Sequence, residues 1–153
     1  MTMLSGPRDI SVLGNRLQQA PAVTTKLMVE VAGATCRRPV RPTEETMRIE
    51  RLIAPSAWTD AALALIDLEL PQWQVRRIAY DGGEWHCALS RQRELPEWLD
   101  QPIETRHADL PLALLGAFVE AKRATAPRGR TSVPLVLREA GMRCMPVCCD
   151  NFA

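Results

Sequence analysis

The sequence lacks a charge excess and a long apolar segment, and it has few aromatic residues apart from tryptophan. Its 19 Lys and Arg residues against 18 Asp and Glu leave a formal net charge of +1, so no whole-protein field would attract nucleic acid or an anionic membrane. The longest apolar run, LPLALLGAFV at 110–119, is shorter than the about 20 residues that a membrane-spanning helix requires. We therefore expect no membrane span.

Signals for secretion and for a disulfide framework are also missing. The N-terminus has no long apolar stretch behind a basic patch, as a secretory signal would have. The five cysteines are an odd number in a chain of 153 residues, which is typical of reduced thiols rather than of a small secreted scaffold. The sequence therefore predicts a cytoplasmic location.

Known catalytic and cofactor motifs are absent, and no catalytic residue or cofactor is predicted. The nearest approach to a metal site is CMPVCC, with Cys144, Cys148 and Cys149, but zinc usually takes two closely spaced pairs of ligands and the second pair does not exist. These cysteines are interpreted as free thiols, and metal binding is the less favoured alternative. His86 and Cys87 are adjacent, but neighbours in a strand point to opposite faces, so we expect Cys87 to lie in the core instead of acting as a nucleophile.

The two ends of the chain differ from its centre. Residues 1–47 contain several Pro and Gly without a sustained period and are predicted to be a largely disordered leader, with a possible strand at KLMVEVAG, 26–33. Residues 124–153 mix Pro, Gly, Arg and Cys and are predicted to form an extended or disordered tail. The core domain is expected at 48–123, so removing 1–46 should change its stability little.

The centre of the chain reads as two helices around a hairpin. Apolar residues at helical spacing predict helices at about 57–69 and 107–124, the second with Asp109 as its N-cap. Between them, two runs rich in aromatic and β-branched residues at 73–90 are separated by Asp-Gly-Gly, which predicts a hairpin. Residues 90–107 contain two Pro and are expected to be a connection.

Alternation in the second run of the hairpin assigns its faces. Trp85, Cys87 and Leu89 share one face, which we expect to be the buried one. The predicted fold is therefore α+β, a helix–β-hairpin–helix sandwich core with irregular N- and C-terminal tails. An isolated two-stranded sheet is marginal in water, so either 26–33 adds a third strand or the hairpin edge pairs with a second copy of the chain. We favour the homodimer.

The order AALALIDLEL, QVRRIAYDGGEWHCALS and DLPLALLGAFVEAKR resembles the small uncharacterised α-β-β-α sandwich proteins of phages and prophages of α-proteobacteria. In these proteins a Trp-bearing hairpin precedes a helix with a Pro-Leu-Ala-like start, here Pro111 to Ala113. The resemblance covers 57–123 and rests on packing motifs. It implies a phage-derived protein but carries over no catalytic residue.

Four Trp against two Phe and one Tyr favour a binding function, because Trp is enriched at interface hot spots. The leading hypothesis is a small non-enzymatic protein that binds a protein partner as an adaptor or inhibitor. Its predicted contacts are Trp73, Arg76, Arg77 and Trp98. The alternative is a nucleic-acid-binding regulator that uses arginines of the two tails, namely Arg37, Arg38, Arg41, Arg128 and Arg130.

Overall fold

The computed structural model describes residues 7–35 and 43–126, which form five helices and three strands. Helices flank an antiparallel sheet built on the hairpin, and the predicted α+β class is confirmed. None of the helices in these ranges is long and apolar enough to cross a membrane. The elements in chain order are α1 (Pro7–Gln19), α2 (Thr25–Thr35), α3 (Glu44–Ile53), α4 (Trp58–Glu69), β1 (Gln74–Asp81), β2 (Glu84–Ser90), β3 (Ile103–His107) and α5 (Leu110–Thr125).

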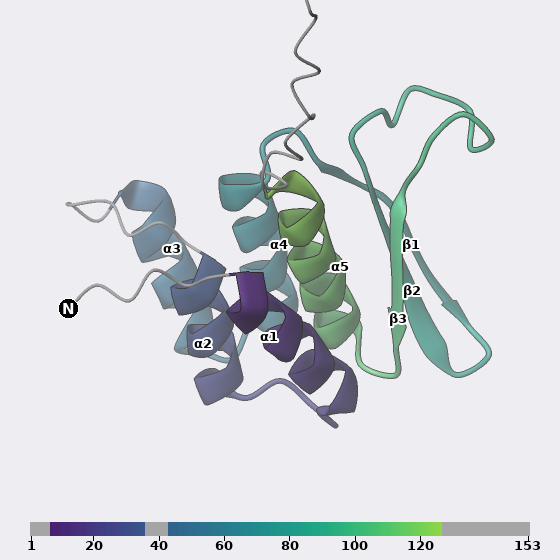
Figure 1. The fold of residues 1–153 in the computed structure, drawn as a ribbon. Helices are drawn as coiled ribbons and strands as arrows, with labels where there is room; N and C mark the ends of the chain where they lie inside the picture. Colours follow the sequence, from purple (N-terminus) through teal and green to yellow (C-terminus); the bar gives the residue numbers. More distant parts are fainter. Residues whose placement is uncertain (1–6, 36–42, 127–153) are drawn as a thin grey trace, which may run out of the picture.

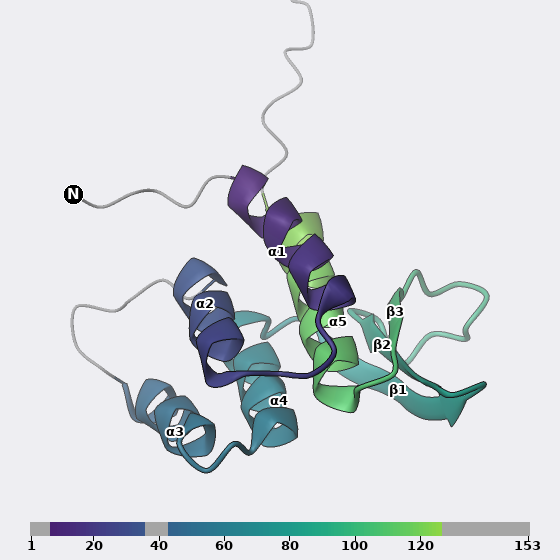
Figure 2. The ribbon, with the colours of Figure 1, turned by 90° about the horizontal axis from the view of Figure 1, so that it is seen from below.

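The helices and the sheet form separate layers. Figures 1 and 2 show the five helices on one side and the three strands on the other, with α5 next to the sheet. The strand order is β1-β2-β3 and both pairings are antiparallel, so β2 is the central strand and β1 and β3 are edges. Helix α5 packs against β2 and β3 on one face of the sheet and against α1 and α4 on its other side.

Local signals in the sequence position the hairpin and α5. The turn Gly82-Gly83 has φ values of 59° and 87°, a left-handed backbone that glycine adopts at little cost. In β2, Cys87 and Leu89 are buried and Trp85 is half-buried on the face turned to the helices. Ala88 and Ser90 on the other face are buried as well, so burial does not alternate along this strand as the sequence predicted. The side chain of Asp109 accepts a hydrogen bond from the Leu112 amide at 3.2 Å, which confirms its predicted role as the N-cap of α5.

The predicted disordered leader is wrong over the described residues, because α1, α2 and the start of α3 occupy much of it. The possible strand at 26–33 is also wrong, since this segment lies within α2. Buried apolar residues of α1 and α2 face the core at helical spacing, and they include Leu13, Leu17, Leu27, Met28 and Val31. Burial of these side chains stabilises helices that the Pro- and Gly-rich composition obscured. Removal of 1–46 would therefore expose core surface.

The predicted connection 90–107 contains a strand that sequence reasoning missed. Strand β3 pairs with β2, with Cys87 opposite Thr105 and Leu89 opposite Ile103. The hairpin is thus part of a three-stranded sheet, so its marginal stability no longer argues for a dimer. Residues 127–153, and with them most of the predicted tail, lie outside the described residues.

We predict that Leu17→Ala lowers the free energy of unfolding by roughly 2–5 kcal/mol, because it leaves a cavity where α1 meets the core. Val12→Ala on the same helix is the matched control, since Val12 is exposed and its loss should change stability by less than about 0.5 kcal/mol. Urea denaturation followed by circular dichroism measures both. Equal, small losses would mean that α1 is not part of the cooperative fold.

Candidate functional site

The connection between β2 and β3, residues 91–102, projects from the end of the sheet opposite the 82–83 turn (Figure 1). It carries Trp98, which is 80% exposed, and Leu99, which is also exposed. Trp98 was predicted as a partner contact, and neither its side chain nor that of Leu99 anchors the connection to the core. Exposed apolar side chains that stand together on a loop are a feature of interaction sites.

An arginine from the neighbouring strand holds this loop instead. Arg76 donates one Nη1 hydrogen bond to Asp100 Oδ2 at 2.9 Å and another to the carbonyl of Arg93 at 3.2 Å. Its Nη2 donates to the carbonyl of Leu95 at 3.0 Å. The side chain of Asp100 is only 4% exposed, so this ion pair is partly buried. Two of these contacts hold the loop backbone before Trp98, and the third holds the side chain of Asp100 after it.

A bulge in β1 is what frees Arg76 for this role. The register of β1 against β2 shifts between Val75 and Arg77, so Arg76 is the extra residue without a partner in β2. Arg77, the next residue, returns to the regular ladder opposite Ala88 and is exposed. Of the two predicted arginine contacts, Arg76 therefore positions the loop and Arg77 is accessible to a partner.

Trp73 was predicted as a partner contact, and the structure corrects this. Its side chain is 7% exposed and its Nε1 donates a hydrogen bond to Thr125 Oγ1 at 3.1 Å. The guanidinium of Arg91 lies 4.7 Å from the ring centroid, in a cation–π arrangement, and also donates to Thr125 Oγ1. Trp73 thus joins the start of β1 to the end of α5.

Cys87 is a buried core residue and not a nucleophile paired with His86. It lies opposite Ile78 and Thr105 on the face that α5 covers, whereas His86 lies opposite Ala79 and Arg106 on the other face. Burial raises the pKa of the Cys87 thiol to about 11. The thiol therefore stays protonated near neutral pH.

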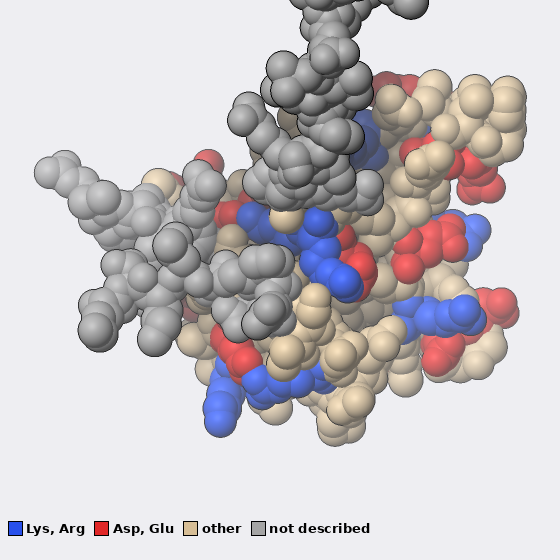
Figure 3. Space-filling view, viewed as in Figure 1, with Lys and Arg blue, Asp and Glu red and all other residues tan. Residues whose placement is uncertain are grey.

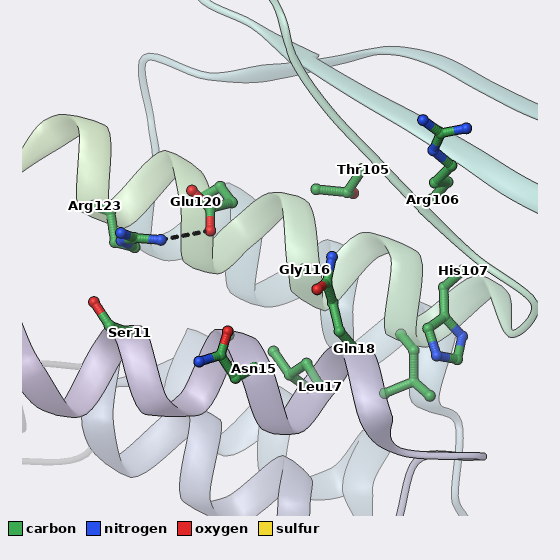
Figure 4. Close-up of a pocket in the computed structure, with 12 residues that line it drawn as sticks. Ser11, Asn15, Leu17, Gln18, Thr105, Arg106, His107, Gly116, Glu120 and Arg123 are labelled. Carbon is green, nitrogen blue, oxygen red and sulfur yellow. Dashed lines mark hydrogen bonds and ion pairs between the residues drawn. The ribbon is translucent and has the colours of Figure 1, made fainter.

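A polar cleft between α1, α5 and β3 was missed, because α1 was interpreted as disordered. Its volume is about 90 Å³. Asn15 and Gln18 of α1 face α5 across it (Figure 4). On α5, Arg123 donates a hydrogen bond to Glu120 at 2.8 Å.

The β3 side of the cleft is already engaged in internal contacts. Thr105 Oγ1 donates to the carbonyl of Ala113 at 2.7 Å, and the Asp109 amide donates to His107 Nδ1 at 2.9 Å. His107 Nδ1 thus acts as the acceptor in this contact. Arg106 lines the rim, with its guanidinium directed away from α1 (Figure 4). The cleft offers no exposed apolar anchor comparable to Trp98.

The predicted nucleic-acid contacts Arg37, Arg38, Arg41, Arg128 and Arg130 lie outside the described residues, as do Cys144, Cys148 and Cys149. Within the described ranges, no group of three His, Cys, Asp or Glu side chains is arranged to hold a metal ion. On the face shown in Figure 3, Lys and Arg side chains stand beside Asp and Glu.

Comparison with known proteins finds no match: no family model, no curated protein and no solved structure is similar to this chain. The function of the site is therefore inferred from its geometry alone.

We predict that Arg76→Ala releases the 91–102 loop, because the substitution leaves the Asp100 carboxylate buried without its partner, at a cost of roughly 3 kcal/mol. Thermolysin cleavage between residues 92 and 100 should become at least about tenfold faster, as expected when local opening is easier. Arg77→Ala removes the adjacent exposed arginine and should leave cleavage unchanged. Equal cleavage of both variants would show that Arg76 does not hold the loop.

Reactivity of Cys87 gives a second check on the face assignment. With its pKa near 11, about 2 units above the ordinary value of 9.0, the thiolate fraction at pH 8 falls about a hundredfold. Iodoacetamide at pH 8 should leave the Cys87 peptide unmodified in native protein and modify it fully in urea, as peptide mass spectrometry would show. Rapid labelling in the native state would contradict the burial.

Proposed function

We propose that this chain is a non-enzymatic binding protein, an adaptor or inhibitor, and that it engages a protein partner through the loop that carries Trp98. The observation that carries the proposal is an indole 80% exposed on a backbone held by the Arg76 contacts. A loop that is held in place before binding loses less conformational entropy in a complex, and large aromatic anchors dominate interface energetics.

The charges around Trp98 indicate the chemistry of the partner surface. Glu97 directly precedes Trp98 and Glu94 lies four positions before it. Both are exposed, as is Arg93, whereas the carboxylate of Asp100 is occupied by Arg76. A partner with an apolar pocket bordered by Lys or Arg would bury Trp98 and Leu99 and face the two free carboxylates. Complementary charge of this kind contributes to orientation and to the association rate.

Self-association is the second part of the proposal. Strand β3 pairs with the outer edge of β2, so β1 has no neighbouring strand on its other side among the described elements. The hairpin therefore keeps one free edge. An edge strand offers unpaired backbone groups to another chain. We include a homodimer formed through this edge. A cytoplasmic location, which the odd number of cysteines favours, and a phage-derived origin belong to the same hypothesis.

The test of partner binding uses the full chain with a photo-cross-linking benzoylphenylalanine at position 98, and at the exposed Val29 of α2 as the control. A discrete protein product at position 98, absent at position 29 and reduced by Glu94→Lys with Glu97→Lys, is expected. A product removed by nuclease would instead favour the nucleic-acid alternative.

For the partner identified in this way, we predict that Trp98→Ala raises Kd about thirtyfold, the equivalent of a hot spot of about 2 kcal/mol. Val29→Ala should leave Kd unchanged, and both variants should melt as the unmodified protein does. Isothermal titration calorimetry measures the two constants. An unchanged Kd for Trp98→Ala would rule out the loop as the contact surface.

A further inference from the structure

The free edge of β1 carries apolar side chains that the helices do not cover. Ile78 lies opposite Cys87 and Tyr80 opposite Trp85, so both share the face that packs on α5. Helix α5 lies over β2 and β3, however, and Ile78 stays 38% and Tyr80 61% exposed. Figure 2 shows β1 as the outermost strand on its side, with no described helix beyond it.

The turn determines which backbone groups point outward from β1. The positive φ values at Gly82 and Gly83 define a two-residue turn whose flanking residues, Asp81 and Glu84, are directly opposite each other and hydrogen-bonded. Bonded and non-bonded pairs alternate along an antiparallel ladder, so Arg77, Ala79 and Asp81 direct their backbone groups toward β2. The backbone groups of Ile78 and Tyr80 therefore point to the free side.

This pattern suits pairing with an identical strand. In an antiparallel pair centred on Ala79, Ile78 faces Tyr80 of the partner subunit, and the two residues can exchange both backbone hydrogen bonds. On the opposite face of the sheet, Arg77 faces Asp81 of the partner subunit. The two-fold axis repeats each contact, so the interface contains two apolar pairs and two pairs of opposite charge.

Other registers lose one of these features. Centring the pair on Ile78 places Arg77 opposite Ala79 of the partner subunit, so the ion pairs are lost. Centring it on Tyr80 places Asp81 opposite Ala79 of the partner subunit and Ile78 opposite the turn. The bulge at Arg76 interrupts the regular ladder on one side and Gly82 ends it on the other, so residues 77–81 are the pairing segment.

We infer that two copies of this chain pair antiparallel through β1 about a two-fold axis at Ala79, which joins their sheets into one of six strands. This inference rests on the self-association part of the proposed function and is independent of the Trp98 loop. The occupant of the edge is a second copy because Arg77, Ile78, Tyr80 and Asp81 complement themselves under the two-fold axis.

The opposite edge of the sheet supplies a matched control. Strand β3 is also an edge strand. It carries an exposed arginine and an exposed carboxylate on one face, Arg106 and Glu104, as β1 does with Arg77 and Asp81. Within the described residues, β3 carries no exposed large apolar side chain like Tyr80. The same charge reversal can therefore be made on either edge.

The experiment is sedimentation velocity of the full chain in reducing buffer. The unmodified protein should sediment as a dimer of the 17.1 kDa chain. Arg77→Asp alone and Asp81→Arg alone place like charges opposite each other and should weaken the dimer at least tenfold. The double variant restores opposite charges and should restore the dimer, which also shows that the substitutions do not act through misfolding. Arg106→Asp should have no effect.

Each contrary result has a distinct meaning. A monomer at all concentrations would overturn both this pairing and the self-association part of the proposed function, and would leave Trp98 binding standing. A dimer broken by Arg106→Asp but not by Arg77→Asp would overturn the β1 pairing alone. A dimer broken by both single β1 variants but not restored by the double variant would overturn the register.

Discussion

Burial of α5 between the sheet and the helices is the interaction on which the other elements depend. Residues Leu112–Leu115 are all buried, and so are Ala117, Phe118 and Val119, so the helix is covered on nearly every side. One side contacts β2 and β3 and the other contacts α1 and α4. A helix that is apolar around most of its circumference requires such cover. Helices α1, α2 and α3 add the buried apolar surface that a core of one hairpin and two helices would lack.

Polar contacts at the ends of α5 orient this layer. Lys122 Nζ donates to Glu69 Oε2 at 2.6 Å, which ties α5 to α4, and the Trp73 indole reaches Thr125 one turn further on. At the other end, Asp109 caps α5 and its own amide bonds to His107 of β3. These contacts are partly buried, so solvent screens them less than it screens surface ion pairs. They hold α5 in place relative to α4, to the start of β1 and to β3.

The bulge at Arg76 links the two surfaces proposed for binding. It turns one arginine toward the carbonyls and the carboxylate of the 91–102 loop, and it ends the regular part of the free β1 edge. One extra residue in a strand thus positions Trp98 and limits how another strand can pair. The loop and the 82–83 turn lie at opposite ends of the sheet (Figure 1), and the pairing segment 77–81 runs between them.

The sequence by itself determined the features that depend on neighbouring residues: the hairpin turn at Gly82-Gly83, the Asp109 cap, and the face of β2 on which Cys87 and Leu89 lie. Tertiary structure decided the rest. Helices α1 and α2 are stabilised by burying apolar residues against distant elements, although the spacing of Ile10, Leu13 and Leu17 was a signal for α1. Strand β3 exists because it pairs with β2, and the separation of Trp73 from Trp98 into core and surface depends on contacts with Thr125 and on the Arg76 bulge. Such contacts join residues far apart in the chain, and local patterns do not record them.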